Sequence, residues 1–305
     1  MADSSSDPSL SAAAWRALAC PQCGGALSPA AGGASCAGCG TEFGRAPTGQ
    51  LDLRLRRPKT SRLEVTLPAP AAREGGEWGR LPVNPAPEVD VSRVDGPCHL
   101  PWDLRTWFPR ARSEGALALD LGCGSQVHKR VCELAGFEYV GLDYATPEAM
   151  LLGDAQALPF ADGAFELVLS IAVLEHVRFP LLMMREAFRV LRPGGRIIGT
   201  VAFLEPFHQD SFHHHTHLGT LNALRFAGFD VERVAPSGGW SGLEAQANMG
   251  LFPGSPRWLS RLLVWPLLLL HRLWWRAGRL FDPTATDARR MLKNSGAILF
   301  LASKR

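Results

Sequence analysis

Between residues 115 and 235 the chain alternates short apolar runs with polar or glycine-rich segments. Apolar runs of about four to eight residues between turn residues are typical of buried strands, whereas apolar positions three or four apart are typical of helices. Val127, Val131 and Leu134 share one helical side within residues 127–135. The predicted strands are Ala116–Leu121, Glu138–Leu142, Ala164–Ile171, Ile197–Phe203, Asp230–Ala235 and residues 297–302. Strands that alternate with helices predict an α/β fold.

The first predicted strand runs directly into a glycine turn, Gly122-Cys-Gly124, and the predicted helix follows. In this arrangement the backbone can approach a ligand at the carboxyl end of the strand. The second strand ends in Asp143, and an acid at that distance suits both hydroxyls of a ribose. The pattern therefore predicts a nucleotide site. A dinucleotide-binding dehydrogenase is disfavoured, because Gln126 and Val127 interrupt the Gly-x-Gly-x-x-Gly pattern.

Composition narrows the class of protein. The 305 residues are 46% hydrophobic and 20% charged, with a formal net charge of +3. These values exclude a disordered chain, a collagen-like fibre and a strongly basic nucleic-acid binder. The first eight residues carry acids and no apolar core, so we expect no secretory signal. No uninterrupted apolar stretch approaches the roughly 18 residues of a membrane span, so we expect a cytoplasmic protein.

Four of the seven cysteines form two Cys-x-x-Cys pairs, Cys20/Cys23 and Cys36/Cys39, with twelve residues between the pairs. Two thiolates at that spacing can coordinate one side of a tetrahedral metal ion, and the second pair supplies the other two ligands. The four cysteines therefore predict a bound Zn²⁺. The segment resembles the Trm112-like zinc ribbon, which implies a structural metal with no chemistry of its own. A ribbon of about 40 residues has too small a core to be stable without its metal. Cys98, Cys123 and Cys132 are predicted to be structural.

Further motifs follow in a fixed order along the chain. They are Gly153-Asp154-Ala155, Leu158-Pro-Phe160, Leu174-Glu-His-Val177 and the glycine turn within residues 189–196. With the first glycine turn and Asp143, this set resembles the class I S-adenosylmethionine-dependent methyltransferases, specifically the type 11 group. The resemblance covers residues 115–235 and the last strand. It implies a doubly wound, mostly parallel, Rossmann-like sheet with S-adenosylmethionine as cofactor.

The resemblance also implies which residues bind the cofactor. Asp120, Gly122, Cys123 and Gly124 would hold the methionine end, and Asp143 and Tyr144 the ribose side. Asp154 and Ala155 would contact the adenine, with Ser170 and Ile171 on the floor. Two features depart from the family: Gln126 replaces a glycine, and only ten residues separate Asp143 from Asp154. The second helix must be short, leaving that edge of the pocket open or covered by residues 78–110.

Histidines are the candidates for acid–base chemistry. His176 follows the predicted strand Ala164–Ile171, and residues 208–217 contain five histidines, His208 and His217 included. The family places substrate-side residues in both regions, so His176, His213 and His215 are the candidate catalytic residues. His213 and His215 share a side if the run is extended, whereas His213 and His217 do so if it is helical. Acceptor binding or base catalysis, a pocket wall and a second metal site remain three interpretations of this run.

An apolar insertion follows residue 235. Within residues 257–279 five arginines accompany four tryptophans, and no acid lies between them. The longest apolar run is nine residues and contains Pro266, which covers at most about 14 Å. Such a segment suits a helix in a membrane interface, making peripheral membrane contact. The alternatives are a helical hairpin on the sheet or a dimer contact, and each favours a lipophilic or bulky acceptor.

We therefore expect six segments: a disordered N-terminus at 1–15, a zinc ribbon at 16–45 and a proline-rich connector or lid at 46–114. The methyltransferase core at 115–235, the apolar insertion at 236–285 and a last helix and strand at 286–305 follow. The predicted function is methylation of a small or lipid-like acceptor. One alternative is an RNA methyltransferase, which near-neutral charge disfavours although a basic cluster spans residues 54–62. Another is a non-catalytic, cofactor-binding scaffold.

Overall fold

The computed structural model describes residues 10–65, 78–94, 99–207 and 210–305. Within them the main sheet has eight strands in the order β10-β11-β9-β8-β5-β6-β7-β4. All neighbouring pairs are parallel except those of β11, which is antiparallel to β9 and β10. The strands are β4 (Leu51–Asp52), β5 (Leu117–Leu121), β6 (Glu138–Asp143), β7 (Leu151–Leu152), β8 (Phe165–Ile171), β9 (Leu191–Ala202), β10 (Asp230–Pro236) and β11 (Ala297–Ser303). The doubly wound, mostly parallel sheet is confirmed.

Different elements cover the two faces of this sheet. Helices α4 (Pro180–Val190) and α5 (His217–Ala227) pack on one face, where their buried side chains join those of β5, β6 and β8. The opposite face is covered by α3 (Lys129–Leu134) together with the connector, including η1 (Val91–Arg93) and α2 (Trp102–Arg105). Both faces are buried, as the unbroken apolar patterns of the central strands require.

The connector packs on a face of the main sheet. The sequence left the edge of the cofactor pocket either open or covered by residues 78–110, and Leu81, Leu104 and Phe108 are buried on that sheet face instead. The abbreviated second unit is present, since residues 144–150 form turns and bends between β6 and β7. The edge beyond β7 is occupied by β4, which pairs with it in parallel.

The N-terminal segment forms a small three-stranded antiparallel sheet. Its strands are β1 (Leu27–Ala30), β2 (Gly33–Cys36) and β3 (Glu42–Phe43), and α1 (Ala12–Arg16) precedes them. The expectation of disorder over residues 1–15 is wrong for residues 10–15. Leu10 is buried, and the Ser11 hydroxyl caps α1 by accepting a hydrogen bond from the Ala14 N–H. Residues 1–9 lie outside the described part of the chain.

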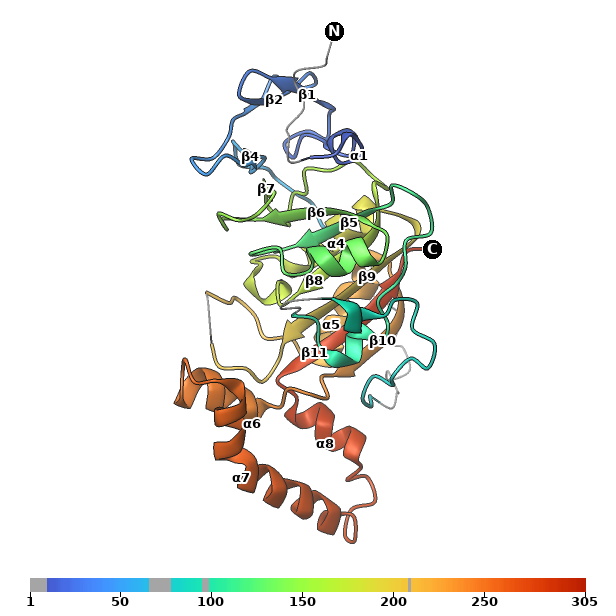
Figure 1. Ribbon diagram of the computed structural model, residues 1–305, viewed down its shortest axis with the longest axis vertical. Coiled ribbons are helices and arrows are strands. Elements are labelled where there is room, and N and C mark those ends of the chain that lie inside the picture. Colours follow the sequence, from blue (N-terminus) through green and yellow to red (C-terminus); the bar gives the residue numbers. More distant parts are fainter. Residues whose placement is uncertain (1–9, 66–77, 95–98, 208–209) are drawn as a thin grey trace.

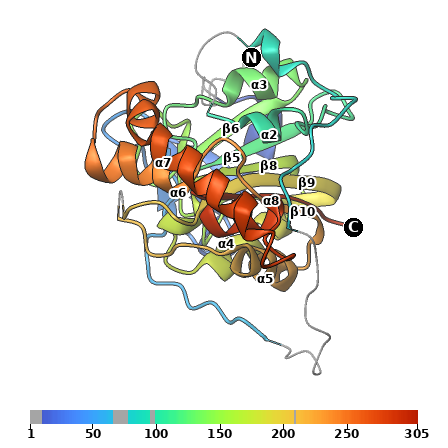
Figure 2. The ribbon, with the colours of Figure 1, turned by 90° about the horizontal axis from the view of Figure 1, so that it is seen from below.

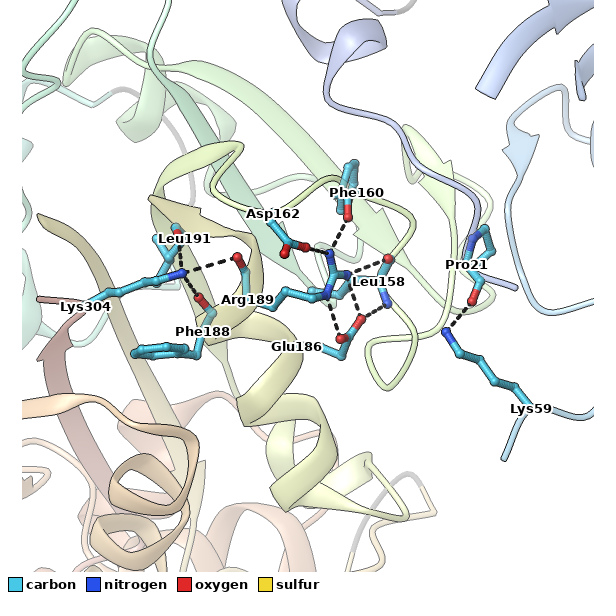
Figure 3. A network of polar contacts seen from close by, with 10 residues as sticks. All are labelled: Pro21, Lys59, Leu158, Phe160, Asp162, Glu186, Phe188, Arg189, Leu191 and Lys304. Atoms are coloured by element: carbon cyan, nitrogen blue, oxygen red, sulfur yellow. Dashed lines mark hydrogen bonds and ion pairs between the residues drawn. The ribbon is translucent and has the colours of Figure 1, made fainter. Parts of the chain in front are cut away.

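The ribbon is joined to the main domain by backbone pairing. The N–H of Ala19 donates to the carbonyl of Pro159, and that of Ala161 donates to Ala17. Arg189 holds the loop of the main domain that pairs with the ribbon. Its guanidinium donates hydrogen bonds to the carbonyls of Leu158 and Phe160 and to the carboxylates of Glu186 and Asp162 (Figure 3). Although burial opposes it, pairing with Glu186 raises the pKa of this guanidinium, so the charge is permanent.

The C-terminal insertion extends from the opposite end of the molecule (Figure 1). It contains α6 (Gly242–Ala245), a π-helical turn η3 (Gln246–Leu251) and the long α7 (Arg257–Gly278), and α8 (Asp287–Asn294) follows it. Viewed from below, α7 crosses in front of the sheet (Figure 2). Among the described residues, we find no helix with the length and hydrophobicity needed to span a bilayer.

Candidate functional site

A cavity of about 730 Å³ lies at the carboxyl ends of β5, β6, β7 and β8. Its volume is in the range of small-molecule sites, and carboxyl ends of parallel strands are where α/β sheets bind ligands. The turns that follow these strands, together with the turn η2 (Leu174–His176), supply most of the wall. The lining residues are Gly122, Gly124, Leu142, Asp143, Tyr144, Thr146, Gly153, Asp154, Ala155, Gln156, Ala172, Val173, His176, Val177, Arg178 and Phe212.

Two glycines shape the turn after β5. Both have positive φ, and a Cβ on Gly122 would lie 2.7 Å from a methyl of Val173, so no side chain fits there. A Cβ on Gly124 would meet no atom within 4 Å, because that position opens into the cavity. A ligand can therefore contact the backbone directly at Gly124.

Gln126 adopts the backbone that the missing glycine would have, with φ 59°. Its side-chain amide donates to the carbonyl of Glu148, and the residue is not part of the cavity wall. The substitution therefore leaves the approach to the turn open.

Asp143 is one of the two acidic residues in the described cavity wall, with Asp154. Its carboxylate accepts hydrogen bonds from the N–H groups of Gly124, Ala145 and Thr146 at 3.0 to 3.1 Å. Partial burial acts to raise the pKa of Asp143, but these backbone donors lower it below its usual value. A carboxylate has about four acceptor positions, so acceptor capacity remains for a ligand hydroxyl. The group is ionised and fixed in place before any ligand binds.

Asp154 and Ala155 lie in the wall opposite the glycine turn, in the segment after β7. Asp154 Oδ1 accepts from the backbone N–H of Gln156 at 2.8 Å and from its side-chain amide at 3.1 Å. Gln156 in turn accepts from the N–H of Phe179, which ties this wall to the start of α4. The wall is thus shaped by a local turn that the Asp154 carboxylate closes.

Four residues of the predicted cofactor set lie behind the wall rather than in it: Asp120, Cys123, Ser170 and Ile171. Asp120 is 1% exposed and its carboxylate is occupied, because Tyr139 donates to it at 2.8 Å and His128 Nδ1 lies 3.1 Å away. The Asp120 carboxylate is therefore engaged by buried partners inside the fold. Ser170 is fully buried within β8, and Ala172 and Val173 take the place in the wall expected for Ser170 and Ile171.

The outer wall is formed by His176, Arg178 and Phe212. The Arg178 guanidinium lies over the Phe212 ring, 5.1 Å from its centroid. The N–H of Phe212 donates to the carbonyl of the buried Glu175 at 2.7 Å, and the Glu175 carboxylate accepts from the Ala202 N–H at 3.1 Å. Phe212 is thereby held beside η2, although it is 36 residues distant from His176 in the chain.

The other two candidate histidines lie beside this wall but outside the cavity lining. The run is extended there, and the rings of His213 and His215 are 5.7 Å apart. Burial, with a smaller contribution from His213, lowers the pKa of His215 to about 4, so His215 is neutral near pH 7. The four cysteines are the one described group of three or more potential metal ligands, and it does not include these histidines; His208 is outside the described residues.

The four cysteine sulfurs of the ribbon lie within 4.8 Å of one another. The Sγ atoms of Cys23 and Cys36 are 3.5 Å apart, and those of Cys20 and Cys39 are 3.8 Å apart. A tetrahedral site with zinc–sulfur bonds of about 2.3 Å has edges of about 3.8 Å, so the donor set fits Zn²⁺. Burial raises the pKa of the Cys20 thiol to about 12, whereas a hydrogen bond with Thr41 lowers that of Cys39 to about 6. Of the other cysteines, Cys123 and Cys132 are buried and Cys98 lies outside the described residues.

Sequence reasoning missed part of the cavity wall. Thr146, Gln156, Arg178 and Phe212 were not singled out. Thr146 and Gln156 are within three residues of predicted site residues, so proximity was a usable signal. Arg178 and Phe212 are likewise within two residues of the candidates His176 and His213, but the contact that joins their two loops is tertiary and has no local signal in the sequence.

The chain is similar to known methyltransferases. The family described as "Methyltransferase domain" matches residues 119–199. An uncharacterized methyltransferase of Mycobacterium sp. (strain KMS) is 32% identical over 174 residues, which cover 50% of this chain and 69% of that protein. The ubiquinone/menaquinone biosynthesis C-methyltransferase UbiE of Roseobacter denitrificans is 50% identical over 92 residues, covering 30% of this chain and 34% of that protein.

Among solved structures, an S-adenosylmethionine dependent methyltransferase from Mesorhizobium loti is similar with a TM-score of 0.40. Its sequence identity is 18%, and the match covers 66% of this chain and 95% of that one. The assignment of the fold rests on the strand order and not on this likeness.

Proposed function

Because the chain belongs to the methyltransferase family, we propose that it methylates a small or lipophilic acceptor at the outer wall of the 730 Å³ cavity. The observation that carries the proposal is the ionised Asp143 beside the open backbone of Gly124. A ribose needs hydrogen-bond acceptors for its hydroxyls, and a methionine end needs close backbone approach. Both requirements are met in one cavity at the carboxyl ends of the strands.

We assign the wall residues as follows. Asp143 would accept hydrogen bonds from the ribose, and Gly122 and Gly124 would admit the methionine end. Asp154 and Ala155 would contact the adenine. S-adenosylmethionine, when bound, supplies an electrophilic methyl group on a sulfonium. The chain's own contribution is to orient the acceptor and exclude water, which Phe212 and Val177 favour as the apolar part of a wall that also holds His176 and Arg178.

A base is required only when the acceptor must lose a proton. His176 is the candidate, because it is the one histidine in the described cavity lining. His213 donates through Nε2 to the carbonyl of Arg178 at 3.2 Å, so it would position the loop that carries Arg178. His215 lies behind it as a neutral group.

We further propose that Zn²⁺ at the four cysteines is structural. Gly25 and Gly38 lie so close to the cysteine sulfurs that a Cβ at either glycine would be 3.2 to 3.7 Å from Sγ atoms. This leaves no room for a substrate between these glycines and the sulfurs. The four cysteines are also far in sequence from the residues of the cavity wall, and no cysteine of the cluster lines the cavity.

RNA methylation is less well supported. Of the basic cluster, Arg54 and Arg56 both pair with Asp52, at 2.8 and 3.3 Å, and Lys59 donates to the carbonyl of Pro21 (Figure 3). These contacts neutralise or occupy much of the charge that a phosphate backbone would need.

The test is calorimetric titration with S-adenosylmethionine of the wild type, of Asp143→Asn and of the exposed control Asp90→Asn. We expect wild-type binding that the control retains and that Asp143→Asn weakens about 100-fold, because hydrogen bonds to a charged group are lost. Absence of wild-type binding would overturn the proposed activity. Equal binding by Asp143→Asn would overturn the assignment of the ribose site.

A further inference from the structure

Helix α7 exposes an unusual amount of apolar surface. Nine large apolar side chains between Trp258 and Trp274 are each at least 42% exposed, and Trp274 is 75% exposed. The next turn adds Leu280 and Phe281, at 83% and 88%. Exposed apolar residues scattered singly are ordinary, whereas a contiguous series along one helix marks an interaction surface.

The rest of the insertion covers only a narrow stripe of this helix. Ser260 is buried and accepts a hydrogen bond from Asn248 of η3 at 3.1 Å. Val264, Leu268, His271 and Trp275 are half-buried and follow Ser260 at intervals of three or four residues. One side of α7 therefore packs against its neighbours, and the broader side is left open.

Arginines line one flank of the open side. Arg261 and Arg272 line a shallow hollow of about 250 Å³ with Trp265 and Leu269, so charged and apolar side chains are adjacent. Residues 257–294 contain eight basic and two acidic residues, a net charge of +6, compared with +3 for the whole chain. Arg261 pairs with Glu244 and Arg279 with Asp287, which leaves the segment strongly positive.

We propose that the open side of α7 binds the surface of an anionic membrane, with the helix lying along the interface. Tryptophans beside apolar residues suit the boundary between acyl chains and headgroups, and flanking arginines suit anionic lipid. A two-fold contact between two copies through this face would bring together two segments 257–294, each with a net charge of +6, so charge favours lipid over a dimer.

The position of the patch relative to the cavity adds to the argument. Exposed Leu251 and Phe252 continue it along η3. A Cβ at Gly250 would lie 3.4 Å from Pro206, and the next residue, Phe207, is 71% exposed. An apolar surface thus extends from α7 toward the segment that carries Phe212 of the cavity wall. If the proposed function holds, the acceptor reaches the cavity from the membrane.

Flotation of the purified full chain with lipid vesicles tests the proposal. Vesicles of phosphatidylcholine alone are compared with vesicles of equal parts phosphatidylcholine and phosphatidylglycerol. We expect binding to the anionic vesicles that salt weakens. Arg272→Gln and Arg276→Gln should each weaken the partition coefficient about fivefold, and the double substitution Leu270→Gln/Trp274→Gln at least about tenfold. Arg130→Gln on α3 and Leu218→Gln on α5, which are exposed elsewhere, serve as matched controls.

Three results would overturn the proposal: no vesicle binding by the wild type, equal binding by the α7 variants, or equal loss in the controls. Sedimentation velocity of the wild type in the absence of lipid adds a further outcome. A dimer that the α7 variants dissociate, with no binding to vesicles, would assign the face to a second copy. S-adenosylmethionine binding by each variant shows that it is folded, and vesicle binding by Asp143→Asn separates this proposal from the proposed function.

Discussion

The two additions to the methyltransferase core use their apolar residues in opposite ways. The ribbon buries Leu18, Leu27 and Phe43 in the same hydrophobic cluster as the strands of the main sheet, and it pairs with that domain through backbone hydrogen bonds. The insertion buries one stripe of α7 and exposes the remainder. Apolar surface buried within the chain stabilises the fold, whereas apolar surface left exposed at this extent serves binding.

The largest effect that would test this contrast is loss of the Zn²⁺ that we propose for the ribbon. Cys36→Ser, or a chelator, should lower the free energy of unfolding by more than about 4 kcal/mol and the melting temperature by about 10 °C, because Cys20 and Cys36 belong to the shared core. Calorimetry with elemental analysis measures both. Ser28→Ala on β1 should retain one zinc per chain. An unchanged melting temperature in metal-free protein would contradict a structural role.

The next effect compares one leucine from each addition. Leu18→Ala removes a buried side chain of the ribbon where its backbone pairs with Phe160 of the main domain, so we expect a loss of about 3 kcal/mol in the free energy of unfolding. Leu270→Ala removes a side chain that is 62% exposed, so we expect a change within about 0.5 kcal/mol. Urea titrations measure both. A similar loss for the two variants would show that α7 also packs in solution, and the contrast would fail.

The smallest expected effect is the loss of stability in acid that is caused by His215, in the segment between β9 and α5. The pKa of His215 is lowered to about 4 by burial, so the unfolded chain takes up a proton at higher pH than the folded protein does. Stability should therefore fall as the pH decreases from about 6.5 toward 4, by about 2 kcal/mol between pH 7 and pH 5. His215→Gln should lose less over that interval in urea titrations. His271 of the insertion has a lowered pKa too, so His271→Gln is the matched variant. If the stability of His215→Gln fell more steeply in acid than that of the wild type, the predicted destabilising effect of His215 would be refuted.

The predicted strands agree with the structure because each is an apolar run between turn residues, a local signal. The glycine turn and Asp143 lie in the cavity wall for a similar reason, since strand ends and turns are both readable in the chain. The sequence left the position of the connector open. Its apolar residues show that it must be buried, but both a pocket edge and a sheet face satisfy that requirement. Asp120 illustrates the same limit, because its proximity to the glycine turn did not reveal that His128 and Tyr139 occupy its carboxylate.

The amino-acid sequence by itself determined where strands form along the chain, the two cysteine pairs and the acid at the end of β6. Each of these depends on residues close together in sequence. The pairing of β4 with β7, the contact of Phe212 with the η2 wall and the exposed side of α7 were decided by the tertiary structure. Each of these depends on which distant surfaces meet and exclude water. An apolar residue carries the same preference for burial wherever it stands, so only packing decides which partner covers it.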